Sequence, residues 1–395
     1  MFYDVVVNDA TLGAFVEGIV PKAYSVFSKA PATADAVVEL ARQLREHPPA
    51  TPSTSVAFVF CSRHHAENAE ALSASLHDIL APLPFVGWVG HAAICGMHLN
   101  EDTPGISVLV LDDVGAFVQT APTADLVAQT AAQLVADAPH GQLRVLAAPV
   151  AGFDAANFFP PVDEQMSPVV GGLSGVSPHD AGPLLPGVAQ GEYAMVSLDG
   201  ARGLIGVAQG AQLLGPVHTV TKSDGSRVDE LDGQRALHVL RQEVPEGTAD
   251  HLQQLWPRLF AAVVSDDEQV FTMRPLAGVL PADGALLTAS TLPPRSQVAL
   301  AMRDGEAART DLEETLHSMR KQLGQQRPLA VLVFAHQARD RGLFDVEGYD
   351  AERISDVFGD DVPTVGVLTP GEVATVGAHT QLLGQSAVIC ALVAS

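Results

Sequence analysis

Residues 363–392 read PTVGVLTPGEVATVGAHTQLLGQSAVICAL, and residues 84–113 read PFVGWVGHAAICGMHLNEDTPGISVLVLDD. Both pass from an apolar, β-rich run through a glycine and a polar residue, and then through a second glycine into another apolar run. Short apolar runs bounded by turn residues are typical of buried strands. The two stretches therefore predict one strand–turn–strand unit that occurs twice.

The repeat extends upstream of both stretches. An apolar run over 56–62 and a helical pattern over 66–80 precede the first copy, and an apolar run over 329–336 with a short helical pattern precedes the second. A period this long with two copies indicates a duplicated domain rather than a solenoid. We therefore expect an α/β (α+β) fold: two pseudo-repeated layered domains with mixed β-sheets flanked by helices.

Two further patterns predict local structure. Helices are expected over 33–46 and 124–138, where apolar residues recur at helical spacing. The step Asp199-Gly200 lies between two β-like runs, which predicts a hairpin over 192–211.

The composition restricts the class of protein. The chain has 395 residues, 47% hydrophobic and 17% charged, which indicates a globular protein with more than one core. Its formal net charge of -24 argues against a nucleic-acid partner, because a phosphate backbone would be repelled. Cys61, Cys95 and Cys390 lie in or beside apolar runs without CxxC spacing, so we expect reduced, buried thiols.

The N-terminal segment predicts neither secretion nor membrane insertion. It lacks a basic region, and its apolar run is broken at Asn8 and Asp9. No window reaches the roughly 18 to 20 apolar residues of a membrane helix, so a cytoplasmic protein is expected. Residues 1–7 are expected to add a strand to a sheet of the same chain or to contact a partner.

Neither metal nor cofactor motifs are present. His64 and His65 are consecutive, and neighbouring positions on a helix face different ways, so they make a poor joint metal site. They are expected to be surface or capping residues, with one of them lining a pocket as the alternative. No HExxH spacing occurs, and residues 171–178 fit no phosphate-binding or nucleophile motif, so we expect no metal, no cofactor and a turn instead of a nucleophile at Ser174.

Charged residues follow the apolar run that ends near 336. The segment 335–342 offers His336 and Arg339, and arginine is well suited to capture a carboxylate or phosphate. The alternative is a solvated loop with a surface Asp-Arg pair.

Arg274 lies in the strand-like run VFTMRPLAGV, where a positive charge needs a partner. Glu372 is one candidate, or both residues face a ligand with opposite charges. An amino acid is such a ligand, because its carboxylate suits an arginine and its ammonium suits a glutamate. A two-residue insertion sets Gly90-His91 against Gly371-Glu372, and neutral His91 cannot replace a glutamate, so the copies are expected to have diverged.

These stretches also resemble a known family. The chain is similar to FIST (F-box and intracellular signal transduction) proteins, with FIST N and FIST C parts, from about residue 30 to the end. The resemblance rests on FVGWVGHAAICGMHLNEDTPGISVLVL and VVGGLSG in the N part, and on GPVHTVTKSDGSRVDELDGQRALHVL and VGVLTPGEVATVG in the C part.

The resemblance implies a sensory, ligand-binding module. We expect an N-terminal extension over 1–32, a FIST N-type domain over 33–215 and a FIST C-type domain over 216–395. A small polar molecule is expected to bind between the repeated halves, and the signal is expected to pass to a downstream signalling protein or through a homo-oligomer. The expected ligand-binding residues are Arg274, Glu372, Gly371, His336, Arg339, Gly90, His91 and His64.

Two other functions remain open at this point. A hydrolase or transferase would use histidine and acid groups in one pocket, such as His91 or His336 near Ser62 or Cys61. An interaction scaffold would instead present a large exposed apolar patch.

Overall fold

The computed structural model divides into two compact units, which are described separately. We call residues 209–312 the inserted unit and the rest the repeat unit. The structure describes residues 21–99, 101–121, 142–150, 153, 167–175, 182–185, 193–248, 252–264, 271–289, 291–377 and 379–395.

The repeat unit begins with a four-stranded sheet in the order β1-β6-β2-β3. Strands β2 and β3 are parallel, and the other two pairs are antiparallel. A small hairpin, β4 and β5, separates β3 from β6. The elements are β1 (Lys22–Ser28), α1 (Thr33–Glu46), β2 (Val56–Ser62), α2 (Ala69–Leu80), β3 (Phe85–Gly90), β4 (Ala93–Cys95), β5 (His98–Leu99) and β6 (Ile106–Asp112), with 3₁₀ turns at Pro52–Thr54 and Arg63–Asn68.

The same four-stranded arrangement occurs twice more in this unit. The orders β7-β10-β8-β9 and β11-β23-β19-β20 repeat the pairing of the first sheet, with the last two strands parallel in each. The second repeat comprises β7 (Ala116–Ala121), β8 (Leu143–Pro149), β9 (Val169–Ser174) and β10 (Tyr193–Leu198). The third comprises β11 (Ala201–Ala208), α7 (Gly305–Leu323), β19 (Ala330–His336), α8 (Arg341–Phe344), α9 (Tyr349–Phe358), β20 (Thr364–Thr369), β21 (Glu372–Val376), β22 (His379–Leu383) and β23 (Ala387–Ala394).

A short PxVG sequence marks the third strand of each repeat: Pro84–Gly87, Pro168–Gly171 and Pro363–Gly366. Each proline carbonyl accepts a hydrogen bond from the neighbouring strand, with N···O distances of 2.9, 2.9 and 2.8 Å. Each glycine lies against the backbone of its parallel neighbour, and a Cβ on Gly366 would overlap the Val333 carbonyl oxygen. The two copies expected from the sequence are therefore the first and third of three.

The three sheets are joined in a cycle. The hairpin of the first repeat pairs with β20 of the third, and the hairpin of the third pairs with β9 of the second. Leu184 of the second repeat forms an isolated bridge with Gly87 in β3 of the first. Each third strand thus has its outer edge covered by the next repeat, which protects an edge that could otherwise pair with another chain.

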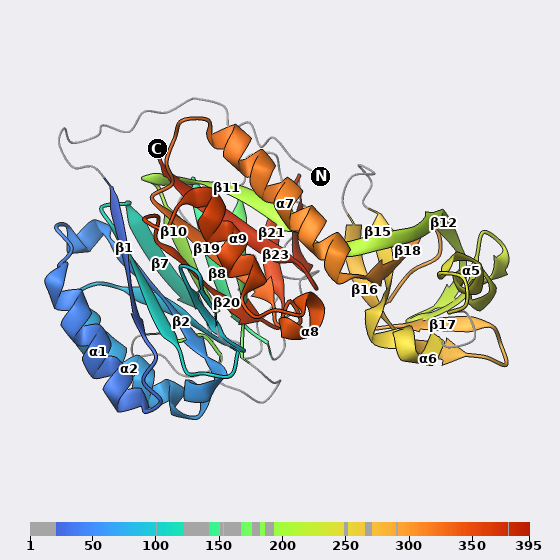
Figure 1. The fold of residues 1–395 in the computed structure, drawn as a ribbon, viewed down its shortest axis with the longest axis horizontal. Coiled ribbons are helices and arrows are strands. Elements are labelled where there is room, and N and C mark those ends of the chain that lie inside the picture. The colour runs from blue at the N-terminus through green and yellow to red at the C-terminus, as the bar shows by residue number, and fades with distance from the viewer. Residues whose placement is uncertain are drawn as a thin grey trace. The chain divides into compact units, whose positions relative to one another are not determined.

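Strand alternation explains how the first sheet is buried on both faces. Ala57, Val59 and Cys61 belong to the core cluster that also contains residues of α1 and α2. These helices lie side by side next to β1 and β2 (Figure 1). On the other face, Phe60 stacks on Trp88 at 5.0 Å, and both rings contact Phe334 of the third repeat.

The inserted unit follows β11 in the chain and ends within α7, so its strands interrupt the third repeat between the first strand and the first helix of that repeat. It contains a seven-stranded sheet in the order β12-β18-β15-β16-β17-β13-β14 and its own hydrophobic core. Its elements are β12 (Ala211–Asp224), β13 (Arg227–Leu231), β14 (Gln234–Arg235), α5 (Ala236–Glu243), α6 (Leu252–Leu255), a 3₁₀ turn (Trp256–Arg258), β15 (Leu259–Val264), β16 (Phe271–Leu280), β17 (Ala285–Thr288) and β18 (Gln297–Arg303).

The expected mixed α/β fold is confirmed, and the predicted helix over 33–46 coincides with α1. The predicted hairpin over Asp199-Gly200 is wrong, because β10 pairs with β7 and β8 while β11 pairs with β23. This step links two sheets instead. The expected helix over 124–138 and the contacts of residues 1–7 lie outside the described residues, and the domain boundary at 215/216 stays a prediction.

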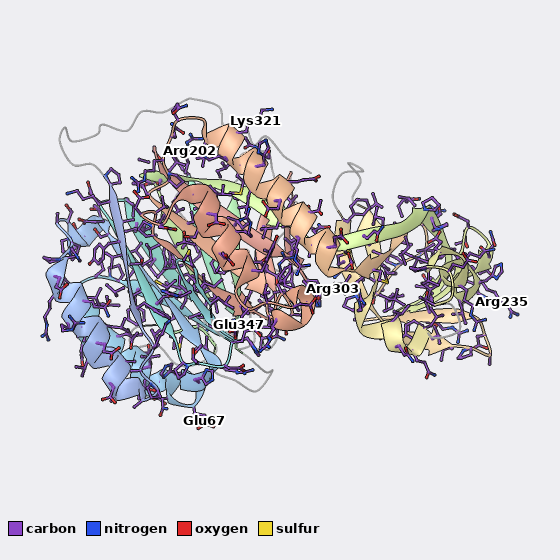
Figure 2. The ribbon with its side chains drawn as sticks, viewed as in Figure 1. Glu67, Arg202, Arg235, Arg303, Lys321 and Glu347 are labelled. Carbon is purple, nitrogen blue, oxygen red and sulfur yellow. The ribbon has the colours of Figure 1, made fainter. Side chains whose placement is uncertain are left out.

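Charged side chains of the repeat unit lie on its surface at several elements. Glu67, which follows β2, is exposed, as are Arg202 on β11 and Lys321 on α7 (Figure 2). In the part of the chain that the structure describes, no helix has the length and apolar character needed to cross a membrane.

Candidate functional site

The ends of β3, β9 and β20, together with the turns that follow them, hydrogen-bond to one another. We call this set of contacts the hydrogen-bonded ring. In the first of these contacts, the Leu368 N–H donates to the Ala92 carbonyl at 2.9 Å, and the His91 N–H donates to the Leu368 carbonyl at 2.7 Å. Leu173 and Val89 occupy the place of Leu368 in the other repeats. Leu173 donates to the Gly371 carbonyl at 2.9 Å, and Val89 accepts from the Gly175 N–H at 2.7 Å.

Hydroxyl groups complete this ring where the backbone cannot. Pro370 takes the position of His91 and has no N–H to donate. The Thr369 hydroxyl donates to the Leu173 carbonyl instead, at 2.6 Å. In the second repeat, the Ser174 hydroxyl accepts from the Val89 N–H at 3.0 Å, so Ser174 has a structural role in the ring.

The strand register corrects the expected alignment of the two turns. Gly90 pairs with Ser62 as Thr369 pairs with His336, so Gly90 is equivalent to Thr369. The hairpins agree, because Ala93 lies opposite Val367 while Glu372 lies opposite Gly172. Gly90-His91 is therefore not the counterpart of Gly371-Glu372, and no insertion separates the copies. Register follows backbone hydrogen bonds, which similar Gly-polar pairs at different positions do not reveal.

Glu372, the first residue of β21, has no exposed surface. Its Oε2 accepts hydrogen bonds from the Ser386 hydroxyl at 2.7 Å and the Ser386 N–H at 3.3 Å. Burial raises the pKa of Glu372 to about 8, against the opposing effect of Ser386 and of the charge on Arg339. Its other oxygen, Oε1, is buried and has no hydrogen-bond partner among the described residues.

Arg339 and His336 lie at the end of β19, in the same repeat as Glu372. Arg339 is buried and forms a bidentate ion pair with Asp350, at 2.6 and 2.9 Å, so the solvated-loop alternative is wrong. Its guanidinium carbon lies 5.2 Å from the centre of the Phe344 ring. His336 is half-buried, and its Nδ1 accepts from the Ala338 N–H at 3.1 Å.

His91 and His64 lie near one another in a second group. The Arg63 guanidinium is 3.0 Å from the Nδ1 atom of His91. Burial, followed by the positive charge of Arg63, lowers the pKa of His91, while Asp340 acts in the opposite direction. His91 is therefore neutral near pH 7.

The two histidines after β2 differ in exposure, and the expectation that both are surface or capping residues is wrong for His65. His65 is buried and its Nδ1 lies 3.0 Å from the Thr33 hydroxyl, whereas His64 is exposed. The His64 Nδ1 lies 3.4 Å from the Ser62 hydroxyl, but no hydrogen bond among the described residues joins His64 to a carboxylate. Burial raises the pKa of the thiols of Cys61 and Cys390, so neither is poised as a thiolate.

Arg274 lies in β16 of the inserted unit, opposite Ala261. It is half-buried, and burial lowers its pKa. Its Nε has no hydrogen-bond partner within the described ranges. Its pairing with Glu372 or with a ligand stays a prediction.

The inserted unit contains a charged cluster that the sequence patterns did not predict. The two ring nitrogens of His218 lie 2.7 Å from Asp232 and 2.6 Å from Glu243. Burial alone would lower the pKa of His218, but its hydrogen bonds to the two carboxylates outweigh burial and raise it. The residues come from β12, the turn after β13 and the end of α5. The signal was the GPVH…ELDG stretch, which places a histidine on β12 and an acid directly after β13, the strand that pairs with β12.

No group of three or more histidine, cysteine or acidic side chains suited to hold a metal ion occurs within the described part of the chain. The arrangement can instead offer a buried neutral acid, a fixed arginine and a neutral histidine.

Family models match most of the chain. A model described as the FIST N domain matches residues 55–234, and one described as the FIST C domain matches residues 236–375. The chain belongs to the FIST domain family. FIST domains are associated with signal transduction and sensing.

Two mycobacterial proteins are similar over nearly their whole length. The uncharacterized protein Rv0628c of Mycobacterium tuberculosis is 27% identical over 378 residues, which cover 91% of this chain and 96% of that protein. The uncharacterized protein Mb0898c of Mycobacterium bovis is 26% identical over 381 residues, which cover 90% of this chain and 95% of that protein.

Proposed function

We propose that this FIST protein is a cytoplasmic, non-enzymatic sensor that binds a small polar metabolite of the amino-acid type at the turn containing Gly371 and Glu372. The observation that carries the proposal is Glu372, whose carboxyl group is buried while its Oε1 lacks a hydrogen-bond partner among the described residues. Buried acids with strongly shifted pKa values are common at functional sites. A downstream protein or a homo-oligomer would receive the signal.

A ligand ammonium group would supply what Glu372 lacks. With a pKa of about 8, the empty site holds a neutral acid at pH 7. A nearby positive charge favours the ionised carboxylate, so binding of an ammonium would release a proton. Arg339, which Asp350 holds in place, would attract the ligand carboxylate, and His336 lies at the same strand end.

The burial of Glu372 couples binding to movement. Because its side chain has no exposed surface, a ligand can reach Oε1 only if the surrounding turns move. The Gly371 carbonyl is held by Leu173, and the Gly90-His91 turn belongs to the same hydrogen-bonded ring. Differential contacts with open and closed states are what allow a ligand to shift a conformational equilibrium.

The test is a thermal-shift screen with the twenty common amino acids, followed by calorimetric titration of any hit at pH 6.5 and 8.5. We expect affinity to rise by on the order of twenty-fold between these values, because the carboxylate must be ionised in the complex. Glu372→Gln should abolish binding. Glu352→Gln makes the same chemical change at an exposed position on α9 and should leave binding intact.

Each alternative result has a defined meaning. A hit that binds Glu372→Gln as tightly as the parent protein would place the site elsewhere. A complete absence of thermal shifts would reject the amino-acid class of ligand.

A further inference from the structure

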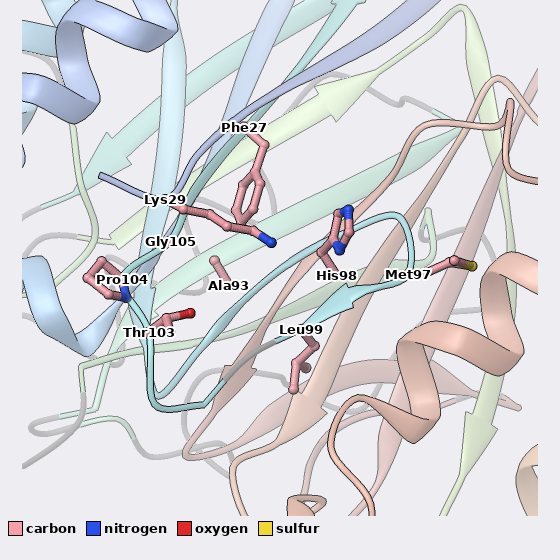
Figure 3. Close-up of a pocket in the computed structure, with 9 residues that line it drawn as sticks. All are labelled: Phe27, Lys29, Ala93, Met97, His98, Leu99, Thr103, Pro104 and Gly105. Carbon is pink, nitrogen blue, oxygen red and sulfur yellow. The ribbon is translucent and has the colours of Figure 1, made fainter. Parts of the chain in front are cut away.

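The first repeat contains a pocket whose lining includes no residue of the Glu372 group. A cavity of about 120 Å³ lies where the end of β1, the β4–β5 hairpin and the loop before β6 meet. Figure 3 shows the Lys29 ammonium, the His98 ring and the Thr103 hydroxyl around this space. The lining residues are Phe27, Lys29, Ala93, Met97, His98, Leu99, Thr103, Pro104 and Gly105.

The charge of this cavity differs from that of the chain as a whole. The chain carries a formal net charge of -24, but the lining contains no acidic residue and includes Lys29 and His98. The Lys29 Nζ lies 5.7 Å from the centre of the Phe27 ring, and that ring stacks on His98 at 6.4 Å. No ion pair among the described residues involves Lys29 or His98.

Comparison with the third repeat explains why space exists here. The register makes Ala93 equivalent to Glu372, and Gly105 precedes β6 as Ser386 precedes β23. In the third repeat, the Glu372 carboxyl group fills this position and accepts a hydrogen bond from Ser386. In the first repeat both residues are smaller, with Ala93 in place of the glutamate and Gly105 in place of the serine. The two positions are adjacent, since a Cβ on Gly105 would lie only 3.6 Å from the Ala93 Cβ.

We propose that this cavity binds a small monocarboxylate of about two to four carbons, whose carboxylate takes the place that the Glu372 carboxyl group has in the third repeat. Lys29 supplies the opposite charge, and Thr103 and His98 supply hydrogen-bond donors. The Gly105 N–H is not available, because it already donates to the Ser62 hydroxyl at 2.9 Å. An apolar cavity of roughly 150 Å³ holds benzene, so this volume suits a ligand of about four to six heavy atoms.

This site is separate from the one proposed at Glu372. Its lining residues come from the first repeat, and none of them belongs to the Glu372, Ser386 and Arg339 group. The two proposals can therefore fail independently.

Calorimetric titration with acetate and propionate, at constant ionic strength, tests the proposal. Acetamide has nearly the same shape as acetate without its charge, and chloride has the charge without the shape. We expect acetate and propionate to bind and both comparison solutes to fail. Lys29→Gln should weaken binding by about ten-fold or more, whereas Lys22→Gln, at the opposite end of β1, should have little effect.

Ala93→Glu provides a second variant, because it would introduce the side chain that fills this position in the third repeat. Acetate binding should disappear in Ala93→Glu and persist in Glu372→Gln. The proposal is overturned if acetamide or chloride binds as well as acetate, if acetate does not bind, or if Lys29→Gln retains the affinity of the parent protein. Lys29 is exposed, so its substitution should not impair folding.

Discussion

The first and third repeats have the same strand pairing and differ in the side chain at the start of the hairpin. Both contain a parallel strand pair, an antiparallel fourth strand and a hairpin that extends a neighbouring sheet. At the start of that hairpin the third repeat has Glu372, hydrogen-bonded to Ser386, and the first has Ala93 beside Gly105. The first repeat is left with a cavity and the third with a buried acid.

This difference shows how a repeated scaffold acquires distinct chemistry. The hydrogen-bonded ring around Leu368, Val89 and Leu173 is formed by main-chain groups and by the hydroxyls of Thr369 and Ser174, and it does not involve the Glu372 or Ala93 side chains. A buried carboxyl group is costly to ionise, whereas an empty space beside a lysine attracts an anion from solution. Under the two proposals above, the same register position would hold a cationic ligand group in one repeat and an anionic ligand in the other.

The largest expected effect concerns the buried acid. The pKa of Glu372 is raised from 4.5 to about 8, so the stability of the protein should be greatest below about pH 4.5 in this respect and should fall as pH rises through 8. At ~1.4 kcal/mol per unit, the full effect is at most about 5 kcal/mol. Glu372→Gln removes this ionisation, so the variant should be the more stable protein at pH 9 and similar to the parent near pH 4.5.

Urea denaturation at pH 5 and pH 9 measures this effect. Glu352→Gln is the matched control, since it changes an exposed acid on α9. Equal stability of Glu372→Gln and the parent at pH 9 would show that the carboxyl group is not buried as described.

The next largest effect is a difference in stability between alanine substitutions at Gly366 in β20 and at Gly87 in β3. A Cβ on Gly366 would overlap the Val333 carbonyl oxygen, whereas one on Gly87 would lie 3.0 Å from the Val59 carbonyl oxygen. Backbone overlap cannot be relieved by a side-chain rotation, so Gly366→Ala should cost about 3 kcal/mol and Gly87→Ala about 1 kcal/mol. Chemical denaturation at pH 7 gives both values, and a larger loss for Gly87→Ala would contradict the comparison.

The effect expected in the inserted unit is smaller than that of Gly366→Ala and concerns a second pH-dependent group, His218. The pKa of His218 is raised, so its stabilising effect should be complete below about pH 6.5 and should be lost as pH rises through the folded-state value. His218→Gln should cost about 1 to 2 kcal/mol near pH 6, because charge-assisted hydrogen bonds to Asp232 and Glu243 are lost.

Because Glu372 and His218 both lower stability as pH rises, the double variant separates them. The His218→Gln and Glu372→Gln changes should add, and the pH dependence that remains between about pH 7 and pH 8 should be small. A strongly pH-dependent double variant would assign the effect to other groups.

Local pattern predicted individual elements well. The helix over 33–46 and the strand over 56–62 coincide with α1 and β2, because each has a clear periodicity and turn residues at its ends. The Asp199-Gly200 step has the local chemistry of a hairpin, yet its flanking strands join different sheets. A turn sequence determines that the chain reverses direction, but it does not determine which strands pair with the two strands that the turn connects.

That the expected site residues bind a ligand stays a prediction. Glu372 and Arg339 were identified as unusual charges, and the structure gives each a buried position in one repeat. The counterpart of Glu372 was misassigned to His91, because Gly-polar pairs look alike without the strand register. Lys29 and His98 were not considered, since neither has a distinctive neighbour in sequence and only the fold brings them to one cavity.

The sequence by itself determined the elements, the α/β class and the presence of duplication, because periodicity and turn residues act over a few positions of the chain. The tertiary structure decided that there are three repeats and that their turns close into a hydrogen-bonded ring. It also decided that Ala93 in the first repeat is equivalent to Glu372 in the third. Those facts depend on hydrogen bonds between residues far apart in sequence, such as Leu368 with Ala92, and no local pattern encodes which distant partner a backbone group will find.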